Sequence, residues 1–219
     1  MAPPAVPKWF WIVPLSTVLL AGCHDAPEEK ERWNKVFSSP QPVFNANPNA
    51  FLVEVVSNRR PGMALDLGMG QGRNALYLAQ RGWSVTGVDI SDVGLAQARQ
   101  QAQKLGVQLN TILENADKFD FGKERWDLVV LLYFPPRPYV SRIRASLKPG
   151  GIVVVEGLHR DSPERQRLGQ GVVFGANELL RVFDDFRILR YEDVIASSDW
   201  GSSENREPAR VVRLLAQKN

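Results

Sequence analysis

The stretch ALDLGMGQGRNALYLAQRG, residues 64–82, decides the fold. Three alternate glycines, Gly68, Gly70 and Gly72, separate a short apolar run from a segment of helix-forming residues. Glycine allows the backbone to adopt left-handed conformations and to approach a ligand closely. We therefore expect a strand, a ligand-binding loop and a helix, in that order.

Strand-like and helix-like segments alternate on both sides of this loop. Apolar and β-branched runs predict strands at 63–67, 83–89, 107–113, 126–134, 152–157, 187–195 and 209–217. Helical patterns fall at 50–60, 74–80, 92–105, 139–147 and 177–186. The last two strands have no helix between them. The sequence therefore predicts an α/β fold with a Rossmann-like, doubly wound, mainly parallel seven-stranded sheet that ends in an antiparallel strand pair.

Composition limits the functions that this chain can have. It has 219 residues, of which 44% are hydrophobic, enough for one well-buried domain. The formal net charge is +3 and the basic residues are scattered, so we expect no nucleic-acid partner. Cys23 is the single cysteine, which excludes an intramolecular disulfide and a cysteine-based zinc site. With only two histidines, His24 and His159, we expect no metal site.

Residues 1–25 read as a separate N-terminal segment. Lys8, an apolar run and the sequence Leu-Ala-Gly-Cys at 20–23 follow one another, as in a secretory signal. The ending resembles a bacterial lipobox, in which the cysteine is lipidated, so we expect Cys23 to anchor the chain to a membrane. Two alternatives stay open: a start codon placed too far upstream, which predicts a cytoplasmic protein, or an uncleaved apolar arm.

The glycine loop alone leaves its ligand open. A phosphate-binding P-loop is excluded, because its Gly-Lys-Ser/Thr ending is absent. The dinucleotide pattern G-x-G-x-x-A does match at residues 70–75, and Asp89 ends the next strand near the expected spacing. However, Asp66 lies two residues before the first glycine. A carboxylate there disfavours a pyrophosphate and favours a ligand with an ammonium group.

Three segments together resemble a known family. ALDLGMGQGRNALYLAQRG, VTGVDIS at 85–91 and SLKPGGIVVVEG at 146–157 are similar to motifs of the class I S-adenosylmethionine-dependent methyltransferases, most of all the small tellurite-resistance type. The similarity extends from about Trp33 to the C-terminus. One departure is Met69, where many relatives have cysteine or another small residue. The resemblance implies a methyltransferase domain at 63–219, preceded by a linker with helices at 26–62.

The resemblance also implies a set of residues that bind the cofactor, S-adenosylmethionine. Asp66 and the glycine loop would hold its methionine part, with the carboxylate near Arg73 and Asn74 at the start of a helix. Asp89 would accept hydrogen bonds from both ribose hydroxyls, because an ionised carboxylate only accepts. The set is completed at the adenine by Ile90, Ala116 and Asp117. Alternatives stay open for three acids and bases: a surface salt bridge for Arg73, a turn cap for Asp89 and a solvated loop acid for Asp117.

Two residues are candidates for the reaction itself. Tyr133 ends the fourth strand, where the binding crevice of a doubly wound fold lies, so with Phe134 it would line the acceptor pocket or face the sulfonium. His159 follows the fifth strand and has a suitable ordinary pKa for a general base. Core packing is the alternative for Tyr133, and a solvated or hydrogen-bonded side chain is the alternative for His159.

We therefore predict an enzyme that transfers a methyl group to a small-molecule acceptor by in-line displacement, in the general class EC 2.1.1.-. Positioning alone can lower such a barrier by about 7–11 kcal/mol, so a clear catalytic constellation is not required. Two rival functions remain: an NAD(P)-dependent oxidoreductase, and a membrane-tethered, non-catalytic cofactor-binding module.

Overall fold

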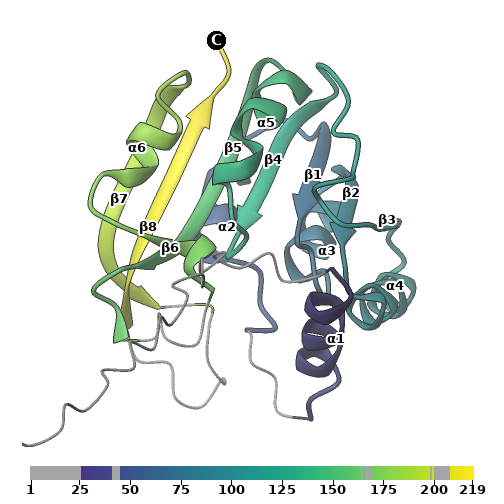
Figure 1. The fold of residues 1–219 in the computed structure, drawn as a ribbon. Helices are drawn as coiled ribbons and strands as arrows, with labels where there is room; N and C mark the ends of the chain where they lie inside the picture. Colours follow the sequence, from purple (N-terminus) through teal and green to yellow (C-terminus); the bar gives the residue numbers. More distant parts are fainter. Residues whose placement is uncertain (1–25, 41–44, 164, 166–168, 198, 200–207) are drawn as a thin grey trace, which may run out of the picture.

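One eight-stranded sheet forms the centre of the protein (Figure 1). The structure is a computed structural model that describes residues 26–40, 45–163, 165, 169–197, 199 and 208–219. The sheet order is β3-β2-β1-β4-β5-β8-β7, and β6 pairs with β5. Its strands are β1 (Met63–Leu67), β2 (Ser84–Asp89), β3 (Asn110–Leu113), β4 (Trp126–Leu132), β5 (Leu147–His159), β6 (Val173–Phe174), β7 (Arg187–Ser197) and β8 (Pro208–Gln217).

The direction of the strands confirms the predicted fold class. The ladders from β1 to β6 are parallel, whereas β8 is antiparallel to both β5 and β7. The chain leaves β1 for β2 and β3, then crosses back to place β4 on the other side of β1. This reversal between β1 and β4 is the topological switch point at which open α/β sheets bind their ligands.

Helices cover both faces of the sheet, so the core has two layers. The helices are α1 (Ala26–Phe37), α2 (Ala50–Val56), α3 (Arg73–Gln80), α4 (Asp92–Leu105), α5 (Val140–Ser146) and α6 (Glu178–Val182), with short 3₁₀ turns η1 (Arg137–Tyr139) and η3 (Gln170–Val172). On one face α2, α3 and α4 pack Phe51, Leu78 and Leu95 against the strands. On the other face α5 and α6 contribute Ile143 and Leu179. Alternate residues of each buried strand serve the two layers.

Several predicted boundaries shift by a few residues. The fourth strand ends at Leu132 rather than at residue 134, because Tyr133 adopts a left-handed φ of 58° that a strand cannot continue. The fifth strand begins at Leu147 rather than at residue 152, since Leu147 already pairs with Trp126 across the predicted turn. The short strand β6 is an addition to the seven predicted strands.

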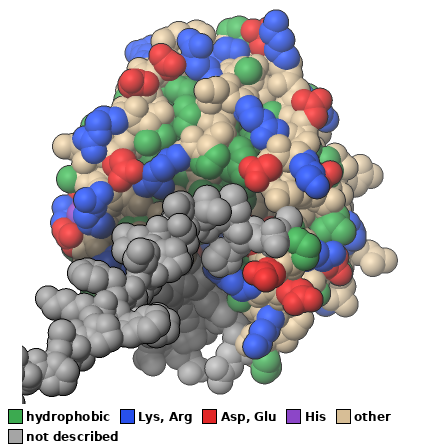
Figure 2. Space-filling model, in the orientation of Figure 1, with side chains coloured by type: hydrophobic (Ala, Val, Ile, Leu, Met, Phe, Trp, Pro, Cys, Tyr) green, Lys and Arg blue, Asp and Glu red, His purple; other side chains and the backbone are tan. Residues whose placement is uncertain are grey.

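The predicted N-terminal segment 1–25, with Cys23, lies outside the described residues. Within the described ranges, no helix combines the length and the apolar character needed to cross a bilayer. On the face that Figure 2 shows, basic and acidic side chains are interspersed rather than gathered into one block.

Candidate functional site

The glycine loop turns the chain sharply between β1 and α3. Gly68, Gly70 and Gly72 have φ angles of 69°, 53° and 78°, a region that residues with a Cβ rarely adopt. The backbone N–H groups of Gly68 and Met69 both donate to the carbonyl of Val88 on β2, at 2.9 and 3.2 Å. The loop is therefore fixed to the neighbouring strand, as expected for a preformed binding site.

A cavity of about 330 Å³ opens beside this loop, within the size range of small-molecule sites. It lies at the carboxyl ends of the parallel strands and is covered by α1 on one side and by the segment around η3 on another. The following predicted residues line it: Gly68, Gly70, Arg73, Asn74, Asp89, Ile90, Ala116, Asp117 and Tyr133. The structure does not place Asp66, Gly72 or His159 on its wall.

Asp89 is held in one orientation at the end of β2. Its Oδ2 accepts the N–H of Gly70 at 2.8 Å, and its Oδ1 accepts the N–H of Ser91 at 2.8 Å. Burial raises the pKa of this carboxyl, while these N–H groups act in the opposite direction. Each oxygen keeps a second acceptor position, and Asp89 lines the cavity. The geometry thus suits a carboxylate that receives two hydroxyl groups.

Asp66 is buried and is not among the residues that line the cavity. The carboxyl is only 2% exposed and accepts the N–H of Ala75, whereas its Oδ2 has no hydrogen-bond partner within the described part of the chain. Burial raises its pKa to about 7, partly offset by the charge of Arg73. A buried oxygen without a partner is costly, and an ammonium group bound at the loop would relieve that cost.

Arg73 and Asn74 begin α3, and both have partners within the chain. The guanidinium of Arg73 donates to Oδ2 of Asp199 at 2.7 Å and to the carbonyl of Asn47 at 3.0 Å. Its charge is therefore already paired. Asn74 is buried, lines the cavity, and accepts the backbone N–H of Asn49 at 2.9 Å.

The segment after β3 forms the far end of the cavity. Ala116 is buried there, while Asp117 is exposed and accepts the hydroxyl of Tyr139 at 2.7 Å. Burial and the neighbouring Asp117 raise the pKa of Tyr139, so this hydroxyl stays protonated and donates. Asp117, the predicted adenine contact, therefore already accepts a hydrogen bond from Tyr139, a residue that the sequence did not indicate as part of the site.

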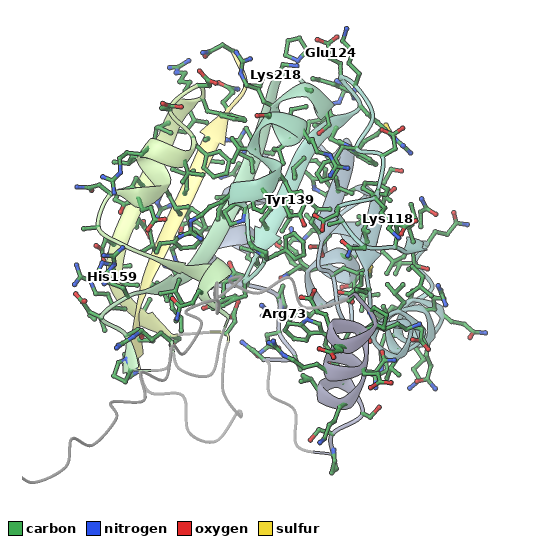
Figure 3. All side chains as sticks on the ribbon, in the orientation of Figure 1. Arg73, Lys118, Glu124, Tyr139, His159 and Lys218 are labelled. Carbon is green, nitrogen blue, oxygen red and sulfur yellow. The ribbon has the colours of Figure 1, made fainter. Side chains whose placement is uncertain are left out.

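The two candidate catalytic residues lie in different places. Tyr133 is on the cavity wall, and its hydroxyl accepts the N–H of Asp199 at 3.3 Å. His159 is buried at the end of β5, where its Nδ1 accepts the N–H of Asp161 at 3.1 Å and its Nε2 lies 3.7 Å from Asp193. Figure 3 shows His159 near the β7 side of the molecule, well apart from Arg73 and Tyr139. This position does not suit the predicted role of general base in the cavity.

Helix α1 is a part of the site that sequence reasoning placed in a linker. Four of its residues line the cavity: Glu29, Arg32, Trp33 and Phe37. The helix is fixed to α4 by Asn34, which donates to Asp92 at 3.0 Å and accepts the hydroxyl of Ser91 at 2.6 Å. The rings of Trp33 and Phe37 stack there with centroids 5.8 Å apart, and in the sequence the only signal for this is two aromatic residues four positions apart, which is unspecific.

We predict that Gly68→Ala destabilises the protein more than Gly106→Ala does, by about 1–3 kcal/mol. Both glycines have a positive φ, 69° and 65°, so they share the backbone cost of alanine. A Cβ at Gly68 would lie 2.3 Å from Cδ2 of Phe134, whereas nothing lies within 4 Å at Gly106. Denaturant unfolding of both variants measures the difference, and equal losses would contradict the prediction.

Comparison with known proteins shows what this chain is similar to. A family model described as a methyltransferase domain matches residues 64–151. Hemagglutinin 1 of Eikenella corrodens is 27% identical over 177 residues, which cover 75% of this chain and 57% of the relative. The probable S-adenosyl-L-methionine-dependent methyltransferase TehB of Haemophilus influenzae is 26% identical over 166 residues, which cover 72% of this chain and 58% of the relative. The chain thus spans less than two thirds of the length of either relative.

Solved structures show the same fold. The crystal structure of TehB from Haemophilus influenzae has a TM-score of 0.66 at 23% identity, and the match covers 78% of this chain and 62% of that one. A Burkholderia thailandensis 1,6-didemethyltoxoflavin-N1-methyltransferase with bound 1,6-didemethyltoxoflavin and S-adenosylhomocysteine has a TM-score of 0.58 at 19% identity, covering 89% of this chain and 81% of that one.

These matches, the fold and the glycine loop support a class I S-adenosylmethionine-dependent methyltransferase domain, with residues 64–151 matched by the family model. Within that class it is similar to TehB.

The residues of the cavity fit the cofactor of this class, S-adenosylmethionine. The loop backbone approaches the cavity where a Cβ would collide with Phe134 or Phe37. Asp89 offers acceptors suited to the ribose, and Oδ2 of Asp66 is buried without a partner among the described residues. Asn74 and the first N–H groups of α3 suit a carboxylate. Within the described ranges, no group of three or more metal-binding side chains accompanies this site.

Proposed function

We propose that the chain transfers a methyl group from S-adenosylmethionine to a small-molecule acceptor by in-line displacement. The observation that carries this proposal is the single cavity that contains both Asp89, oriented by two backbone N–H groups, and an aromatic wall. That wall is formed by Trp33, Tyr133, Phe134 and Tyr139. An acceptor enclosed by these rings and by η3 would lie beside the cofactor in a site that excludes bulk water.

The chain's own contribution to the reaction is binding and alignment. When bound, the cofactor supplies an electrophilic methyl group on its sulfonium. Asp89 holds the ribose, and the aromatic rings orient the acceptor and offer an electron-rich face to positive charge. Orientation of this kind can lower the activation barrier by about 7–11 kcal/mol. The reacting lone pair comes from the acceptor, and the described cavity wall carries no histidine that would act as a base.

Charge supports a small acceptor over a nucleic acid. The net charge is +3, and basic and acidic side chains are mixed on the face shown in Figure 2. Binding to a polyphosphate backbone relies on a concentrated basic surface. The acidic residues of the cavity lining, Glu29, Asp89, Glu114 and Asp117, would also oppose such a backbone.

A methyl-transfer screen tests the proposed function. The purified chain is incubated with S-adenosylmethionine and metalloid oxyanions, thiols, amines or phenols, and released S-adenosylhomocysteine is quantified. We expect acceptor-dependent release by the wild type and none by Asp89→Ala. Tight cofactor binding without release for any acceptor would contradict the proposal and favour a non-catalytic binding module.

We propose separately that residues 1–25 anchor the chain to a membrane through lipidated Cys23. The support is the Leu-Ala-Gly-Cys sequence at 20–23 after an apolar run. Mass spectrometry of the mature N-terminus tests it. A diacylglycerol adduct on Cys23 is the expected result, whereas an intact Met1 and unmodified Cys23 in a soluble fraction would favour a cytoplasmic protein.

A further inference from the structure

Asn49 is a buried residue, 1% exposed, at the start of α2. Its Oδ1 accepts the N–H of Leu52 at 3.0 Å and caps the helix. Its amide nitrogen donates to Oε1 of Glu156 at 2.7 Å and to Oδ2 of Asp199 at 2.5 Å. Both hydrogens of the amide are thus used, and one side chain connects α2, β5 and the segment that follows β7.

The two carboxylates fix the orientation of the Asn49 amide. Arg213 donates to Oε2 of Glu156 at 2.6 Å, and Arg73 pairs with Asp199 at 2.7 Å. Each acid therefore accepts both an arginine and the Asn49 amide, at separate oxygens in Glu156 and at the same oxygen, Oδ2, in Asp199. An amide turned by half a rotation would direct its oxygen at two acceptors, which is unfavourable. Asn49 consequently has one stable orientation.

The backbone of Asn49 then determines how Asn74 faces the cavity. The N–H of Asn49 donates to Oδ1 of Asn74 at 2.9 Å, so the oxygen of that amide already has a partner within the protein. Asn74 lines the cavity, and within the described residues no acceptor contacts its amide nitrogen. The atom left to meet a ligand is therefore a donor, located in the first turn of α3.

We propose that Asn49 is a positioning residue that directs the amide nitrogen of Asn74 toward the cofactor's carboxylate. The inference rests on the proposed function, because it requires a methionine-type ligand in the cavity. Arg73 is held by Asp199 and the carbonyl of Asn47, so its role is to fix two segments to α3. Asn74 and the first N–H groups of α3 provide the donors that bind the carboxylate.

Two ligands that differ only in the carboxylate test this role. Calorimetry gives the Kd of S-adenosylhomocysteine and of its decarboxylated counterpart, 5′-S-(3-aminopropyl)-5′-thioadenosine, and their ratio is the carboxylate preference. The variants are Asn49→Ser, Asn74→Ala and the double variant. Serine keeps the helix cap of α2 but cannot bridge the two carboxylates. Asn47→Ser is the matched control, because it makes the same exchange at an exposed position two residues earlier.

We expect Asn49→Ser to lower the carboxylate preference about tenfold, as for the loss of one hydrogen bond to a charged group. Asn74→Ala should lower it similarly, and the double variant no further, because Asn49 acts through Asn74. Asn47→Ser should leave it unchanged. Equal losses for both ligands, or additive losses in the double variant, would overturn the inference.

Asn74→Asp keeps the test decisive if Asn49→Ser does not fold. This variant can still accept from Asn49, but it presents an oxygen to the cavity, so the carboxylate preference should fall by more than tenfold. An unchanged preference would overturn the inference. Failure of the wild type to bind either ligand would instead overturn the proposed function, and the inference with it.

Discussion

Replacing Asp89 by alanine is expected to weaken S-adenosylhomocysteine binding at least a hundredfold, which corresponds to about 2.7 kcal/mol. The carboxylate is held by the N–H groups of Gly70 and Ser91 and is positioned to accept two hydroxyl groups. Hydrogen bonds to a charged acceptor contribute about 1.5–3 kcal/mol each. Isothermal titration calorimetry at constant ionic strength measures the change.

The control for this experiment is Asp185→Ala, which removes an exposed acid just after α6. It should bind like the wild type, because it lies outside the cavity lining. A folded Asp89→Ala variant whose affinity stays within threefold of the wild type would show that Asp89 only caps a turn.

Replacing Asp66 by asparagine is expected to stabilise the protein at neutral and alkaline pH. The pKa of Asp66 is raised from 3.8 to about 7, mainly by burial, so between these values the folded state binds more protons than the unfolded state. Stability from this group is therefore lost as the pH rises from about 4 to about 7. Three pH units correspond to about 4 kcal/mol, an upper value for the gain at pH 8.

Thermal or denaturant unfolding at pH 5 and pH 8 checks this prediction. Asp66→Asn should gain much more stability over the wild type at pH 8 than at pH 5. Its S-adenosylhomocysteine affinity should fall at pH 8, because the proposed counter-charge to the ammonium group is gone. Asp127→Asn is a control for which the opposite result is expected, a loss of stability at pH 8. Lys148 holds the pKa of Asp127 below its ordinary value despite partial burial, so the ionised carboxylate stabilises the folded state. Loss of stability by Asp66→Asn at pH 8 would contradict the account.

The sheet and the glycine loop are predictable because their signals are local. Buried parallel strands read as apolar runs such as 126–132, and glycines with positive φ stand in alternate positions at 68, 70 and 72. Asp89 follows from its place at the end of the next strand. These features depend on neighbours in the sequence, so spacing alone locates them.

The rest of the site depends on tertiary packing. Nothing near Asn49 in the sequence reveals that its amide reaches Glu156 and Asp199, more than a hundred residues away. The sequence of α1 indicates only part of a linker with helices. Only the structure shows that Trp33 and Phe37 line the cavity. His159 illustrates the same dependence: the sequence places it after a strand near the predicted crevice, whereas in the structure it is the last residue of β5 and is not part of the cavity lining.

The central claim is that the glycine loop binds S-adenosylmethionine, and competitive calorimetry with the purified chain tests it most directly. S-adenosylmethionine and NAD are titrated separately, and each is then titrated into protein saturated with the other. The account predicts one saturable site for S-adenosylmethionine that NAD neither occupies nor blocks. Binding of NAD at one site per chain, with no heat from S-adenosylmethionine, would contradict it and restore the oxidoreductase alternative.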